Sequence, residues 1–221
     1  MLKSKLKSSV AQQARTYLLI CMALFYTGCQ NSPTASSDIA PVANAGAKRT
    51  LGLFQPVYGT KYLMAPITSE GKGDYFSSKG DYANTHNFAF FNTADESVRA
   101  LLPANDYWIV ETKRFPAKEE AGEQPVPVQW FLYSLVKSDT DGDKKLTYKD
   151  NKVLAISDAG GVGYTEIISD VEEVYGQADS EANGLYVIYR SQSRRYVAKI
   201  DLLNRKVVST KELALEFSDL P

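Results

Sequence analysis

The residues whose types and spacing could do chemistry lie in one twelve-residue stretch, 139–150, which reads Asp-Thr-Asp-Gly-Asp-Lys-Lys-Leu-Thr-Tyr-Lys-Asp. Carboxylates stand at positions one, three, five and twelve, and a threonine stands at position nine. Calcium takes six to eight oxygen ligands, and this spacing can wrap that many around one ion. The sequence therefore predicts a calcium site. Its ligands would be Asp139, Asp141, Asp143, the carbonyl of Lys145, Thr147 through a water, and Asp150.

The stretch resembles an EF-hand or dockerin-type calcium loop over these twelve residues, with two departures. Lys144 occupies position six, where glycine is usual because the chain turns there with positive φ. Asp150 replaces the longer Glu at position twelve. Four lysines also lie in or beside the loop, so we expect weak binding, with a Kd of roughly 10⁻⁴–10⁻³ M. The alternative is an exposed Asp-Gly turn without a metal.

The segments that flank the acidic loop indicate strands. Residues 128–136 and 153–157 are aromatic, aliphatic and β-branched, with no polar face at helical spacing. The loop is therefore not part of a helix-loop-helix pair. An ion bound there is expected to hold two strands together. Calcium sensors, in contrast, expose a groove when the ion binds.

The first 28 residues have the pattern of a secretory signal. Four basic residues, Lys3, Lys5, Lys7 and Arg15, precede a ten-residue apolar run, 17–26, which is too short to span a bilayer. The following Thr27-Gly28-Cys29 resembles a bacterial lipobox. This resemblance implies cleavage before Cys29 and lipidation of that cysteine. Gln30, rather than Asp, follows Cys29, and the same resemblance then implies the outer membrane, with the protein facing the periplasm.

The rest of the chain divides into a tether and one domain. Residues 29–50 are rich in Ser, Ala, Pro and Asn and predict a flexible tether, whereas 51–221 can form one β domain with a core. Removing residues 1–28 lowers the Lys and Arg count from 25 to 21, against 26 Asp and Glu. This acidic balance argues against nucleic acid as a partner.

The domain is expected to be all-β and antiparallel. Three stretches, 88–102, 154–168 and 197–210, each read as a strand, a polar turn and a second strand, with further strand patterns upstream of each. The period of about 50 residues suits blades of four strands, and the layout resembles periplasmic propellers of the Tol-associated type. An array of three blade-like units, a fourth unit completed by 51–58, or a β-sandwich would each fit.

Function follows less directly from the residues. With one histidine, His86, and no Gly-x-Ser-x-Gly, the chain lacks the usual hydrolase motifs, so we expect a non-enzymatic binding or scaffolding role in the envelope. The partner would be an envelope protein or a glycan. Two alternatives remain: a hydrolase that uses a carboxylate pair such as Glu172 and Glu173, and a carbohydrate- or peptide-binding module that uses exposed aromatic residues.

Overall fold

A computed structural model describes residues 48–69, 85–116, 126–180 and 183–214, and the secondary structure in these ranges consists entirely of β-strands. Within the same ranges, no helix is long and apolar enough to cross a membrane. The expected signal segment and Cys29 lie outside the described residues, as does nearly all of the expected tether. The first strand begins at Arg49, two residues before the expected start of the domain.

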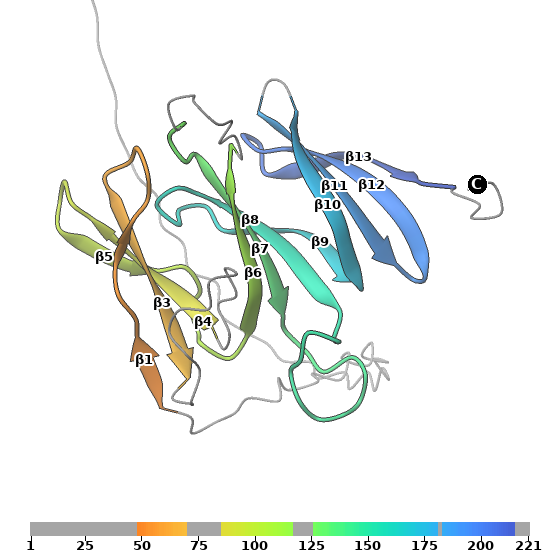
Figure 1. Cartoon of the computed structure of the whole chain (residues 1–221), viewed down its shortest axis with the longest axis horizontal. Helices are drawn as coiled ribbons and strands as arrows, with labels where there is room; N and C mark the ends of the chain where they lie inside the picture. Colours follow the sequence, from red (N-terminus) through yellow and green to blue (C-terminus); the bar gives the residue numbers. More distant parts are fainter. Residues whose placement is uncertain (1–47, 70–84, 117–125, 181–182, 215–221) are drawn as a thin grey trace, which may run out of the picture. The chain divides into compact units, whose positions relative to one another are not determined.

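The described strands form three antiparallel sheets, each built from strands that are consecutive in the chain (Figure 1). In the first sheet the order is β1-β3-β4-β5, and β2 also pairs with β3. Because β1 and β2 come from the stretch around residues 51–58, that stretch adds to the first sheet and does not form a fourth unit. The strands are β1 (Arg49–Leu51), β2 (Gln55–Pro56), β3 (Tyr62–Ser69), β4 (Thr85–Asn92) and β5 (Ser97–Ala100).

The second sheet carries the acidic loop. Its strands are β6 (Trp108–Phe115), β7 (Trp130–Val136), β8 (Lys152–Asp158) and β9 (Thr165–Val171), paired in that order. Residues 139–150 connect β7 to β8, which are the second and third strands of the sheet. The expectation that the loop lies between two strands, without helices, is confirmed.

The third sheet repeats the same antiparallel order. Its strands are β10 (Glu173–Ser180), β11 (Gly184–Ser191), β12 (Arg194–Asp201) and β13 (Lys206–Glu212). The three predicted hairpins are therefore confirmed as β4–β5, β8–β9 and β12–β13. Sequence reasoning missed β10, because the run Gly-Gln-Ala-Asp-Ser in its second half lacks the apolar alternation typical of a strand.

The turns of these hairpins close as their sequences indicate. The carboxylate of Asp158 accepts hydrogen bonds from the backbone N–H groups of Gly160 at 2.9 Å and Val162 at 2.7 Å. Asn92 and Asp201 end their strands in the same way, each accepting one backbone N–H from the turn that follows. Such side-chain acceptors stabilise turns because they replace the strand partners that the turn backbone loses.

The second sheet is buried on both faces, and this fixes the architecture. Residues of β7 alternate between two cores: Phe131, Tyr133 and Leu135 pack with the first sheet, and Leu132 packs with the third. A sheet that is covered on both sides lies in the middle of three layers, whereas a sandwich has two. The fold is therefore an all-β, antiparallel, propeller-like array of three blade-like sheets.

Candidate functional site

The acidic loop brings three of its four carboxylates together. One oxygen from each of Asp139, Asp141 and Asp143 lies within 4.8 Å of the others. Asp141 and Asp143 are exposed and Asp139 is partly buried, so the cluster faces solvent at the end of the second sheet. Carboxylate oxygens at this spacing are the hard ligands that Ca²⁺ requires, and the donor set fits that ion.

Backbone N–H groups hold this cluster in place. Asp139 accepts the N–H of Gly142 at 2.7 Å on Oδ1 and that of Lys144 at 2.6 Å on Oδ2. Lys144 has a φ of 64°, so the sequence expectation that position six requires positive φ is confirmed. The side chain at this position raises the energy of the turn, since only glycine adopts such a φ without steric cost.

Asp150 is placed differently from the three clustered carboxylates. It is fully buried, and its Oδ1 accepts the N–H of Thr140 at 2.7 Å while its Oδ2 accepts the N–H of Thr147 at 2.7 Å. The N–H of Asp141 and both threonine hydroxyls add longer contacts. Asp150 therefore ties the start of the loop to its end, and it would serve an ion only by exchanging some of these bonds.

These contacts also set the ionisation of Asp150. Burial opposes the charged form, but the hydrogen bonds from Thr140, Thr147 and Asp141 outweigh it and hold the pKa of the carboxyl below its ordinary value. The group is therefore a stable anion at neutral pH. Its charge is satisfied within the loop by peptide dipoles.

The other two predicted ligands lie on the return path of the loop. Thr147 is partly buried, and its hydroxyl oxygen accepts the N–H of Lys149 at 3.2 Å. Lys145 is exposed, and its N–H binds the carboxylate of Asp143 at 2.8 Å. Lys137, one of the four lysines in or beside the loop, pairs with Glu166 at 2.8 Å and therefore offsets the negative charge of the loop less than expected.

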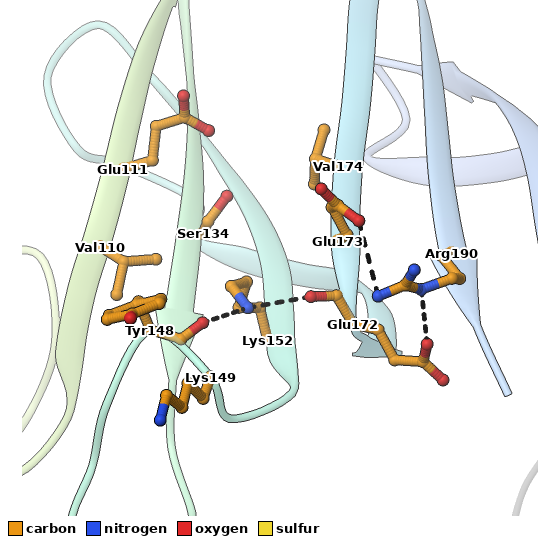
Figure 2. Close-up of a pocket in the computed structure, with 10 residues that line it drawn as sticks. All are labelled: Val110, Glu111, Ser134, Tyr148, Lys149, Lys152, Glu172, Glu173, Val174 and Arg190. Carbon is orange, nitrogen blue, oxygen red and sulfur yellow. Dashed lines mark hydrogen bonds and ion pairs between the residues drawn. The ribbon is translucent and has the colours of Figure 1, made fainter. Parts of the chain in front are cut away.

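Lys152 connects the loop to the third sheet. It is partly buried at the start of β8, and its ammonium donates to three carbonyl oxygens: those of Tyr148 and Asp150, both at 2.9 Å, and that of Glu172 at 3.0 Å (Figure 2). Burial lowers its pKa, while the charge of Asp150 acts in the opposite direction. With all three N–H donors of its ammonium engaged, Lys152 fixes the position of the loop relative to Glu172, the residue between β9 and β10.

A pocket of about 590 Å³ opens beside this connection, between the second and third sheets (Figure 2). Two positions of the acidic loop, Tyr148 and Lys149, form part of its wall, and Lys152 lies between its two sides. The residues that line it are Val110, Glu111, Ser134, Tyr148, Lys149, Lys152, Glu172, Glu173, Val174 and Arg190.

Arg190 organises the acidic side of the pocket. Its Nε binds Glu172 at 2.7 Å and its Nη2 lies 3.5 Å from Glu173. Adjacent residues of a regular strand point to opposite faces of the sheet. Glu172 precedes β10, however, and both carboxylates reach the same guanidinium. Both carboxylates therefore already have a cationic partner, and a hydrolysis that uses them as a pair would have to compete with Arg190 for them.

Several residues of this site carried little sequence signal. Lys152 begins a strand whose next four residues are apolar, and a single lysine there is equally compatible with an exposed strand end. His86 is not near the pocket residues in the chain or in its contacts. It lies in β4, where Nδ1 is 2.7 Å from the carbonyl oxygen of Tyr107, and desolvation lowers its pKa.

Comparisons with known proteins identify no family for this chain. No family model matches it, and no curated protein matches it. Among solved structures, it is similar to the β-propeller domain of the Trilobed protease from Pyrococcus furiosus, with 9% identity and a TM-score of 0.38, over 76% of this chain and 44% of that one. It is also similar to a luciferin-regenerating enzyme, with 12% identity and a TM-score of 0.40, over 75% and 47%. The chain spans less than half the length of either protein.

We expect Lys152→Met to lower the free energy of unfolding by about 2–4 kcal/mol, because three carbonyl oxygens lose their donor. Lys149→Met is the matched control, since the Lys149 ammonium makes no hydrogen bond to a described residue; its effect should stay within about 0.5 kcal/mol. Urea denaturation measures both. Equal effects of the two substitutions would contradict the connecting role of Lys152.

We expect Asp150→Asn to reduce the acid sensitivity of the fold. The pKa of Asp150 is lower in the folded than in the unfolded protein, so its contribution of about 2 kcal/mol is complete above the unfolded pKa of about 3.9 and is lost as the pH falls through the folded pKa. The wild type should therefore exceed the variant in stability at pH 7, and the two should converge in acid. Urea denaturation at a series of pH values measures this.

The control for that experiment is Asp143→Asn. Asp143 is exposed, and within the described residues its side chain accepts only the N–H of Lys145. At pH 7 this variant should keep the stability of the wild type to within about 0.5 kcal/mol. A persistent gap between wild type and Asp150→Asn at low pH would show that the asparagine disturbs packing rather than charge.

Proposed function

We propose that this chain is a lipid-anchored protein of the bacterial cell envelope, whose β domain binds one weak structural calcium ion and has a binding or scaffolding role. The observation that supports the metal is the convergence of Asp139, Asp141 and Asp143 within 4.8 Å. The ligand set would add the carbonyl of Lys145 and, through a water, Thr147. Asp150 would complete it at the cost of some of its backbone hydrogen bonds.

A structural role fits the surroundings of the loop better than a sensing role. The loop joins two neighbouring strands of one sheet. β7 and β8 are paired along their whole length, from the pair Trp130–Asp158 to the pair Val136–Lys152. Calcium sensors respond by moving helices, and the described part of this chain has none. An ion at this position would relieve the repulsion among the three clustered carboxylates and stabilise the connection between the strands.

The proposed binding role is supported by the ion pairs that the carboxylates near the pocket form. Glu172 and Glu173 both contact Arg190, and Glu111 pairs with Lys113 at 3.0 Å. Each of these carboxylates is thus already paired with a basic side chain, an arrangement that suits a binding surface better than a pair of acids free to act on a substrate. The carboxylate-dependent hydrolase remains the competing proposal, and it would require one of these ion pairs to break when a substrate binds.

We expect about 10 mM calcium to raise the free energy of unfolding of the wild type by about 1.4–2.7 kcal/mol, for a Kd of about 10⁻⁴–10⁻³ M. Asp139→Ala combined with Asp141→Ala should abolish this increase, since it removes two converging ligands. Thermal denaturation of the purified protein with calcium, magnesium or EDTA measures it. Asp95→Ala combined with Asp201→Ala, which alters turn carboxylates elsewhere, should keep the calcium response. Equal responses in all three proteins would refute the metal site.

The lipid anchor rests on the sequence of residues 1–30. When the chain is expressed in a Gram-negative host with labelled palmitate, we expect the wild type to take up label and to fractionate with outer membranes. Cys29→Ser should lose both properties, because the thioether that carries diacylglycerol cannot form. Cys21→Ser should keep them, since Cys21 lies in the segment that is expected to be removed. Labelling of the Cys29→Ser protein would rule out this anchor.

A further inference from the structure

The pocket between the second and third sheets is bounded by the first strand of each, and both strands are irregular at this place. The pairing of β6 with β7 shifts between Ile109 and Glu111, and that of β10 with β11 shifts between Val174 and Gly176. Each shift marks a β-bulge, which leaves one residue without a partner in the ladder and reorients neighbouring side chains. Bulges are frequent next to binding sites, and here two of them lie on opposite walls of one pocket.

From this geometry we infer that the pocket binds a neutral saccharide unit, with the ring of Tyr148 as its stacking surface. The inference does not depend on the proposed calcium ion, although Tyr148 and the acidic loop belong to the same connection. A volume of about 590 Å³ lies in the range of about 300–1,000 Å³ that is usual for small-molecule sites.

The charges of the pocket favour a ligand without net charge. Three acidic residues are matched by three basic ones, and two of the basic side chains are already engaged. Lys152 donates to three carbonyls, and Arg190 contacts two carboxylates. The formal charges of the lining thus sum to zero, and Lys149 is the one basic side chain of the lining without a partner among the described residues, so a charged ligand would gain little to offset its lost hydration.

The polar groups that remain are suited to hydroxyl groups. Glu111 and Glu173 face the pocket from opposite walls (Figure 2), and each ion pair uses one oxygen, so the other oxygen has no hydrogen bond within the described residues. The hydroxyl of Ser134 also has no partner there and is directed into the pocket in Figure 2. Sugar hydroxyls donate and accept at once, and they can satisfy both carboxylates and the serine.

The apolar groups supply the other half of a saccharide site. Tyr148 is 67% exposed, and its ring lies beside Val110 at the rim of the pocket (Figure 2). Val174 lies on the opposite wall. Pockets that hold small ligands combine such apolar surface with a few placed polar groups, and the face of a pyranose ring offers C–H bonds to the negative face of an aromatic ring.

A peptide strand is a less suitable occupant. It would have to pair with the free edge of β6 or β10, which needs N–H and C=O groups at regular spacing. The bulges at Val110 and Tyr175 interrupt that spacing at the pocket, as bulges on edge strands commonly do.

The inference can be tested by isothermal titration calorimetry of the full protein with cellobiose, maltose and N,N′-diacetylchitobiose. Each sugar is titrated once in EDTA and once in millimolar calcium. We expect at least one of these sugars to bind with a millimolar Kd in EDTA. Tyr148→Ala should weaken this binding by about tenfold or more, and Tyr148→Phe should preserve it because the ring remains. The matched control is Tyr186→Ala, which removes a tyrosine of 39% exposure on the third sheet and should leave the affinity unchanged.

Two results would overturn the inference: no binding of any of the three sugars, or equal affinity in wild type and Tyr148→Ala. Because Tyr148 is largely exposed, the variants should melt as the wild type does, and a melting curve checks this. Sugar binding in EDTA together with no calcium response would refute the metal while leaving the saccharide site in place. A calcium response without sugar binding would do the reverse.

Discussion

The buried carboxylate of Asp150 is the constraint on which the rest of the site depends. A buried anion is stable only when polar groups surround it, and here the backbone of the loop itself turns inward to supply them. This inward turn leaves Asp139, Asp141 and Asp143 on the outside. It also directs the carbonyl groups of Tyr148 and Asp150 toward Lys152. Because Lys152 also donates to the carbonyl of Glu172, it links the loop to the residue that precedes the third sheet.

Most of the fold could be predicted from the sequence because its signals are local. Each hairpin combines an apolar strand with an Asn or Asp at the turn, and Asn92, Asp158 and Asp201 all bind the turn backbone as expected. One exception is β10, whose ladder depends on β11 rather than on its own composition. A strand that is stabilised mainly by its partner leaves no periodicity of its own to detect.

The site could be predicted only in part, for the same reason. The spacing of Asp139, Asp141 and Asp143 indicates convergence because the loop is short, and the described carboxylates do converge. The role of Asp150 as an acceptor of backbone N–H groups was not predicted, since position twelve of such a loop is ordinarily a ligand. The pocket is lined by residues of β6, of the acidic loop and of the start of β10. These segments are far apart in the sequence, and no local sequence pattern indicates that they are in contact.

The double burial of the second sheet has a consequence for how the chain acquires its structure. During synthesis β6–β9 exist before β10–β13, so the face that carries Leu132, Leu154 and Ile156 initially has no cover. A bare aliphatic surface of this kind promotes aggregation of partly folded chains. The residues of β10–β13, Glu173 to Glu212, therefore cover an apolar face of strands that are synthesised earlier. A chain that ends before β11 would leave this face exposed and be prone to aggregate.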